Sequence, residues 1–170
     1  GVPAPQRPRR AEAAGSPGGA SAGAYEVVKT TLAGTMTFSK VAMQPGKPQG
    51  FGVLDSGTLL FGLPGNPVSA AVSFEVFVRP ALLRMQGRGV LDRAVLTLPA
   101  AAGWRTPPDR RQYLPVTIDR TGPRSWRVIP ATSGGSHLAG GLGRAEAYAV
   151  VHADVDVVEA GDLVDVMLIP

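Results

Sequence analysis

The stretch "LFGLPGNPVSAAVSFEVFVRP", residues 60–80, leads from a run of apolar residues into an amphipathic helix through two prolines, two glycines and an asparagine. A plain turn needs fewer residues with special backbone behaviour. The prolines fix two φ angles, Gly65 permits a close backbone approach, and Asn66 can cap the turn with its own side chain. Ser69 falls in the first turn of the helix, beside backbone N–H groups without helical partners. The pattern favours a rigid loop that presents donors to an anionic ligand, although a simple cap would need only Asn66 or Ser69.

The surrounding sequence predicts the elements of a first region. The apolar runs "GFGVL" and "TLLFGL" flank the turn residues "DSG", which indicates a hairpin or a short strand pair. An apolar stripe at helical spacing predicts a helix from about Val68 to Met85, and Pro80 is expected to kink its last turn. Residues 35–43 alternate as in a strand, and residues 18–34 combine a glycine-rich loop with a short helix.

The character of the chain changes after Gly89. Five short β-rich runs follow, separated by Gly, Pro and Asp turns, and they predict a small β-domain, either a barrel or a sandwich. Residues 1–17 are rich in Pro, Ala and Arg without an apolar pattern, so we interpret them as a disordered segment or linker. The predicted organisation is therefore 1–17 linker, 18–89 first domain and 90–170 β-domain.

Composition narrows the classes of function. The 170 residues contain no cysteine, which excludes disulfides and Cys-ligated zinc or iron–sulfur sites and suits a cytoplasmic protein. The net charge of +4 favours anionic ligands, but after residue 10 no dense basic run and no interleaving of basic and aromatic residues points to nucleic acid. No apolar run approaches the length of a membrane span, and no signal peptide is expected. His137 and His152 have no further ligand partner near them in sequence, so we interpret both as surface or strand residues.

Two further stretches have the residues of an anion site. "SPGGASAG", residues 16–23, places adjacent glycines before a helix, where backbone N–H groups can bind phosphate; an ordinary glycine turn remains the alternative. "QPGKP", residues 44–48, holds Lys47 on a turn stiffened by two prolines. A lysine with little freedom to lose is a good partner for an oxyanion, and an exposed turn lysine is the alternative.

These motifs, in their order and spacing, resemble those of the molybdopterin molybdenumtransferase family, of which the C-terminal domain of gephyrin is a relative. The resemblance runs from Gly18 to near the C-terminus and corresponds to the C-terminal portion of the family. Its most specific part is the pair of "PGKP" and "GLPGNPVSA". The segments that carry it are "GGASAGAYEVVK", "KVAMQPGKPQGFG", "GLPGNPVSAAVSFEVFVRPAL", "RRQYLPV", "GSHLAGGLGRAEAYAVV" and "AGDLVDVMLI".

The resemblance implies an α/β fold: a partial molybdopterin-binding domain with a mixed, largely parallel sheet, followed by a small C-terminal β-barrel-like domain. It implies an enzyme that inserts molybdenum from molybdate into adenylylated molybdopterin and releases AMP, with Mg²⁺ required. It also implies a cytoplasmic homodimer whose active site lies at the subunit interface. The metal ligands are left unknown.

The resemblance also implies roles for individual residues. Lys47, Ser69 and Arg110 correspond to the groups that hold the oxyanion. The pterin-side and pocket-forming positions are Gly18, Gly19, Ser21, Gly23, Pro48, Pro64, Gly65, Asn66 and Pro67. Lys47, Ser69 and Arg110 each supply a donor or a positive charge to an anion, which agrees with the anion sites that the residues themselves suggest.

Several positions depart from the family pattern. Ala24 replaces an acidic residue, Gln44 replaces a second lysine, and Gly140 and Gly141 replace serines. The main alternative is a non-catalytic pterin- or anion-binding module or scaffold related to the same fold. A third possibility is a degenerate product whose incomplete sheet exposes strand edges and folds poorly.

Overall fold

The computed structural model describes residues 11–15, 30, 34–122, 125–131 and 143–169. These residues form two compact units, which are considered separately below. The first unit comprises Gly1–Val41 and Gly46–Asp92, and the second comprises Ala42–Pro45 and Arg93–Pro170. Within the described residues, no helix has the length and apolar character needed to cross a membrane.

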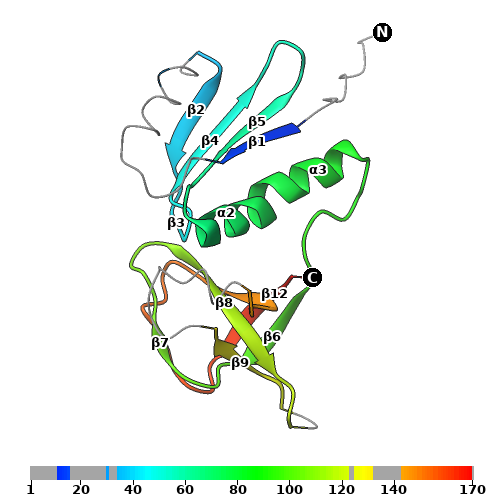
Figure 1. The fold of residues 1–170 in the computed structure, drawn as a ribbon. Helices are drawn as coiled ribbons and strands as arrows, with labels where there is room; N and C mark the ends of the chain where they lie inside the picture. Colours follow the sequence, from blue (N-terminus) through cyan, green and yellow to red (C-terminus); the bar gives the residue numbers. More distant parts are fainter. Residues whose placement is uncertain (1–10, 16–29, 31–33, 123–124, 132–142, 170) are drawn as a thin grey trace. The chain divides into compact units, whose positions relative to one another are not determined.

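The first unit contains a four-stranded sheet (Figure 1). Its strands are β1 (Ala11–Gly15), β2 (Met36–Lys40), β4 (Pro48–Val53) and β5 (Leu59–Leu63), in the order β1-β5-β4-β2. β1 runs parallel to β5, whereas β4 pairs antiparallel with both β5 and β2. The mixed sheet and the predicted hairpin are thus confirmed, with a smaller parallel share among the described strands than we expected.

A continuous helical segment lies along one face of this sheet (Figure 1). It consists of α2 (Pro67–Ser73), a π-helical turn η1 (Phe74–Val78) and α3 (Arg79–Met85). The Arg79 N–H reaches back five residues to the Phe74 carbonyl, and Pro80 follows at once. A proline has no N–H to donate and clashes with the preceding turn, so a wider turn accommodates it within the helix. The predicted helix is confirmed, and the proline is accompanied by a π-turn.

Glycines on β4 and β5 make room for side chains on the sheet. A Cβ at Gly50 would lie 2.9 Å from the Phe38 ring, and one at Gly52 would clash with the Thr35 carbonyl oxygen. Met36, which is buried, lies across the same glycines. A larger residue at position 50 or 52 would push β2 away. This explains why glycine occupies the positions of "GFGVL" that face β2 side chains.

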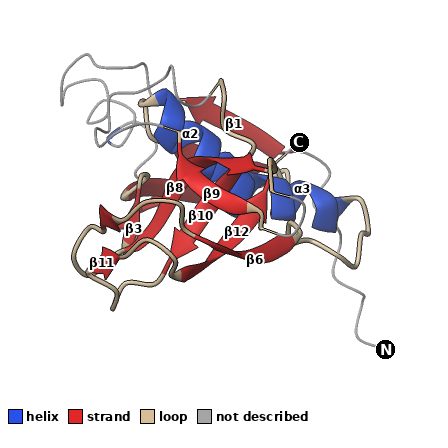
Figure 2. Cartoon of the chain, turned by 90° about the horizontal axis from the view of Figure 1, so that it is seen from below, coloured by secondary structure: helices blue, strands red, loops and turns tan. Residues whose placement is uncertain are grey.

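The second unit is built from a six-stranded sheet with the order β3-β8-β10-β12-β6, and β9 also pairs with β8 (Figure 2). An isolated bridge between Ala100 and Val128, together with the 2.9 Å bond from the Ala101 N–H to the Val128 carbonyl, joins the end of β6 to β9. This closure makes the sheet barrel-like, as predicted. The strands are β3 (Met43–Gln44), β6 (Val95–Pro99), β8 (Arg111–Asp119), β9 (Arg127–Pro130), β10 (Ala147–Val151) and β12 (Leu163–Leu168), with a separate pair β7 (Trp104–Arg105) and β11 (Val157–Val158).

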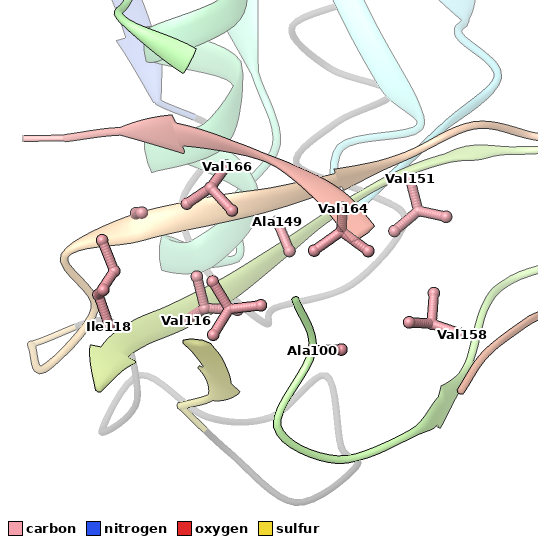
Figure 3. Packing of buried hydrophobic residues seen from close by; sticks show 10 residues of the cluster. Ala100, Val116, Ile118, Ala149, Val151, Val158, Val164 and Val166 are labelled. Carbon is pink, nitrogen blue, oxygen red and sulfur yellow. The ribbon is translucent and has the colours of Figure 1, made fainter. Parts of the chain in front are cut away.

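The core of the second unit fills the space that these strands enclose. Figure 3 shows Val116, Ala149 and Val164 among the side chains that point into it. Valine and alanine dominate the cluster, because alternate residues of β8, β10 and β12 face inward. This core is therefore rich in small side chains.

The observed divisions differ from the predicted ones at three places. Ala11–Gly15, inside the segment interpreted as a linker, forms β1 and pairs with β5. The second unit begins at Arg93, a few residues later than predicted, and it also takes Ala42–Pro45 from the middle of the first region. The short helix predicted within residues 18–34 lies almost entirely outside the described residues.

Candidate functional site

The proline-rich loop before α2 forms a complete helix cap. Asn66 has an extended backbone, and its Oδ1 accepts hydrogen bonds from the N–H groups of Val68 (3.0 Å) and Ser69 (3.3 Å). The Asn66 carbonyl accepts from Ala70 at 2.8 Å, and Pro67 has no N–H. The capping role predicted for Asn66 is confirmed. The expectation that first-turn backbone donors are offered to a ligand is wrong, because the cap already uses them.

The lysine-bearing turn is closed by backbone bonding. The Val41 N–H donates to the Lys47 carbonyl at 2.8 Å, where β2 ends and β4 begins. Gly46 has φ of 103°, a conformation that favours glycine, and it is buried. Lys47 itself is exposed and forms no ion pair with any residue that the structure describes. The turn therefore fixes the lysine backbone and leaves its ammonium group available.

A glutamine that the sequence analysis did not single out connects this turn to the helix. The Gln49 Nε2 donates to the Gly46 carbonyl and to the Ser73 Oγ, both at 2.6 Å. Ser73 is fully buried, so the Gln49 side chain crosses from β4 into the interface with α2. Both amide hydrogens of Gln49 are used, one on the lysine-bearing turn and one on α2.

The two hydrogen bonds of Gln49, called the Gln49 bridge below, connect the lysine-bearing turn to the helix α2. Ser69 and Ser73 are four residues apart on α2 and lie on the same face of the helix. Ser73 is bonded through Gln49 to Gly46, the residue before Lys47. The Gln49 side chain thus connects the turn that carries Lys47 to the helix that carries Ser69.

The remaining predicted positions of the first unit are distributed around this bridge. Pro64 and Gly65 are half-buried between β5 and α2, whereas Pro48, Asn66 and Pro67 are exposed, and Ser69 is buried. The predicted pterin-side residues Gly18, Gly19, Ser21 and Gly23 lie outside the described residues.

Arg110 belongs to the second unit and stands directly before β8. Its guanidinium Nη1 donates to the Gln44 Oε1 at 3.2 Å, and the residue is half-buried. The preceding Asp109 has φ of 54°, in the left-handed region that few residues other than glycine adopt. Arg110 is therefore held at one end of the barrel-like sheet by a turn and by a neutral side chain.

The described residues offer no metal centre. No group of three His, Cys, Asp or Glu side chains among them could hold a metal ion. His152 is exposed in the turn after β10, as expected of a surface residue, and His137 lies outside the described part of the chain. The acidic side chains near the C-terminus are all exposed: Asp154, Asp156, Glu159, Asp162 and Asp165.

Comparisons with known proteins point to one family. The model described as "Probable molybdopterin binding domain" matches residues 16–84, and "MoeA C-terminal region (domain IV)" matches residues 97–169. The chain is 40% identical over 152 residues to molybdopterin molybdenumtransferase 2 of Mycobacterium tuberculosis, and 34% identical over 164 residues to molybdopterin molybdenumtransferase 1 of that organism. These matches cover 85% and 92% of this chain, respectively.

A solved structure gives the same result for the fold. The crystal structure of the molybdopterin biosynthesis MoeA protein of Pyrococcus horikoshii matches with a TM-score of 0.68 and 25% identity, over 93% of this chain and 36% of that one. The chain spans 36% and 38% of the length of the two mycobacterial relatives, little more than a third of each.

Proposed function

Because the chain belongs to the molybdopterin molybdenumtransferase family, of which it matches the C-terminal part, we propose that it takes part in inserting molybdenum from molybdate into adenylylated molybdopterin with release of AMP. The observation that carries this proposal is the Gln49 bridge, which joins the Lys47 turn to the serine face of α2. Two elements that the sequence marks as anion-binding are thereby held together in one unit.

The chemistry of this arrangement suits an oxyanion. Molybdate carries two negative charges, and the exposed Lys47 ammonium supplies a compact positive charge from a backbone that is already fixed. The Ser69 hydroxyl supplies a neutral donor. The proposal places both groups on one ligand with little reorganisation on binding. In the second unit, Arg110 supplies a guanidinium for the same class of ligand.

Among the described residues, no group of three or more His, Cys, Asp or Glu side chains could hold a metal ion, so they identify no Mg²⁺ ligands. The proposal therefore routes no step through Mg²⁺. Homodimerisation and a cytoplasmic location stay predictions.

Equilibrium dialysis against sodium molybdate tests the proposal. The wild-type chain should bind molybdate, and Lys47→Gln and Ser69→Ala should each weaken binding by about tenfold, the loss expected for a charge-assisted hydrogen bond. Lys40→Gln, an exposed lysine on β2, is the matched control and should bind as the wild type does. Binding that is unchanged in the double variant Lys47→Gln/Ser69→Ala would refute the assignment of these groups. AMP release from adenylylated molybdopterin then tests turnover.

A non-catalytic binding or scaffold module is the second candidate. It is favoured by the self-contained cap, in which Asn66 uses the first-turn donors of α2, since a loop built only to connect elements would look the same. Thermal melting separates the two functions. A rise in Tm with molybdate or molybdopterin supports a ligand site, whereas a cooperative melt that neither ligand shifts supports a scaffold.

A further inference from the structure

The partner of the Arg110 guanidinium is a neutral side chain. Two other described arginines with side-chain partners are paired with carboxylates: Arg120 Nη1 lies 2.6 Å from a Glu146 oxygen, and Arg79 Nε lies 3.8 Å from a Glu75 oxygen. Arg110 instead donates to the amide oxygen of Gln44. Among the described residues no carboxylate lies within ion-pair distance of Arg110, although Asp109 precedes it in sequence.

Gln44 is itself fixed to the sheet of the second unit. It ends β3, which pairs in parallel with β8 so that Gln44 lies opposite Gln112. The Arg111 N–H donates to the Ala42 carbonyl at 3.0 Å, and Met43 is 3% exposed, so β3 is held by its pairing with β8 and by the burial of a side chain. The acceptor for Arg110 is therefore a rigid one, although 66 residues separate the two side chains in the chain.

The backbone before Arg110 is constrained as well. Asp109 adopts φ of 54°, and non-glycine residues in this region occur disproportionately at functional sites. The turn sets the direction in which the Arg110 side chain leaves the backbone, and Gln44 sets where its guanidinium stops. Two independent constraints thus act on one side chain.

We infer that Gln44 is a positioning residue that orients Arg110 for an oxyanion without neutralising it. A guanidinium has five N–H donors, and the bond to Gln44 uses one of them. A carboxylate in the same place would also orient the arginine but would cancel its charge. An amide oxygen orients it and leaves the full positive charge for a ligand. The inference rests on the proposed function, because it assumes that Arg110 contacts molybdate.

Two near-isosteric substitutions separate orientation from charge. Gln44→Met removes the acceptor and should weaken molybdate binding by about fivefold to tenfold, while Gln44→Glu keeps an acceptor but pairs with Arg110 and should weaken binding further. Ser125→Glu is the control, because it adds the same charge at an exposed site beyond the other end of β8, a strand whose nine residues span about 26 Å at 3.3 Å per residue. This substitution should change molybdate binding by less than about twofold. If Gln44→Glu binds molybdate as well as the wild type does, the inference is overturned.

A double-mutant cycle with Arg110→Ala shows whether Gln44 acts through the arginine. Gln44→Met should have almost no further effect once Arg110 is absent. An equal loss in both backgrounds overturns the inference alone. If Arg110→Ala leaves molybdate binding unchanged, the assignment of Arg110 in the proposed function fails, and the inference fails with it.

Arginine side-chain NMR gives a readout that does not depend on binding. In ¹⁵N-labelled wild-type chain, the Arg110 Nη–H signals should be resolved at low temperature because rotation of the guanidinium is slowed by Gln44. They should broaden in Gln44→Met while the backbone spectrum of the sheet stays in place. Unaltered Arg110 signals in a folded Gln44→Met chain contradict the positioning role.

Discussion

At the scale of single residues, Gln49 determines how the lysine turn is attached to its unit. Gln49→Met keeps the length of the side chain but removes both hydrogen bonds, leaving the fully buried Ser73 hydroxyl without its donor. We expect the free energy of unfolding to fall by about 1–3 kcal/mol, the cost of an unsatisfied buried polar group. Urea unfolding measures this, with the exposed Gln86→Met as the control. Equal stability of the two variants would show that the bridge contributes nothing.

Glu146 gives the second unit a defined sensitivity to acid. The hydrogen bond from Arg120 and that from the Ile118 N–H lower the pKa of Glu146 below its ordinary value of 4.5, although desolvation opposes them. A native pKa below the unfolded one means that the stabilisation is fully present above pH 4.5 and is lost as the pH falls through the native value. Both side chains are substantially exposed, so the contribution is about 0.2–1 kcal/mol.

The prediction is that Glu146→Gln is less stable than the wild type near pH 7 and that the difference disappears at about pH 3. Urea unfolding at the two pH values checks it, with the exposed Asp92→Asn as a control for the change in charge. A difference that persists undiminished in acid would mean that the carboxylate charge is not the cause.

At the scale of the elements, the start of α2 depends on one side chain. Asn66→Ala leaves the N–H groups of Val68 and Ser69 without the Oδ1 acceptor, and we expect the free energy of unfolding to fall by about 1 kcal/mol. Asn66→Asp keeps an acceptor oxygen and places a negative charge at the helix N-terminus, so it should restore most of that stability. Thermal melts of the three proteins measure the difference, and an Asn66→Ala chain as stable as the wild type would exclude the cap as a stabilising feature.

The packing of β4 against β2 depends on the absence of a side chain at Gly52. An alanine Cβ there would clash with the Thr35 carbonyl oxygen and lie 2.8 Å from the Met36 side chain, so the backbone must shift. We expect Gly52→Ala to cost about 1–3 kcal/mol through overpacking. Gly34→Ala is the control, because nothing lies within 4 Å of its Cβ position. Hydrogen exchange of the β2 and β4 amides would localise the effect, and unchanged protection in Gly52→Ala would contradict it.

At the scale of the whole molecule, the stability of the second unit comes from a compact valine-rich core. Val166→Ala removes two methyl groups at a fully buried position in the middle of β12, and we expect a loss of about 2 kcal/mol from lost burial and the cavity left behind. Val95→Ala is the matched control, because Val95 is 53% exposed on β6. Similar urea midpoints for the two variants would show that the core is not packed as described.

Much of this architecture could be predicted from the sequence. The five β-rich runs after Gly89 each became a strand, since alternating apolar residues such as those of β8 signal a half-buried strand locally. The strands β7 and β11 have two residues each, too few to form a pattern. The sequence predicts a single strand over residues 35–43, which includes Met43 of β3, because nothing in the residues of β3 reveals that it pairs with β8.

The candidate site could be predicted only in part. Lys47 and Asn66 stood out because prolines and glycines around them mark special backbone geometry. Gln49 and Gln44 did not, because a glutamine carries no signal of its partner, and Gln44 lies 66 residues from Arg110. The sequence offers one indication for Gln49, namely a polar residue at an alternating position of a strand that packs against a helix.

The placement of β3 affects how this polypeptide could be divided or exchanged between relatives. A gene segment beginning at Arg93 would encode a barrel without Ala42–Pro45, so the edge of β8 at Arg111 would lose its neighbouring strand. An exchange of coding segments at that boundary would also separate Arg110 from its glutamine. The two units are therefore not separable at a single point in the sequence. Recombination between family members should preserve the β3–β8 pairing and the Arg110–Gln44 hydrogen bond only when the donor supplies residues 42–45 together with the later segment.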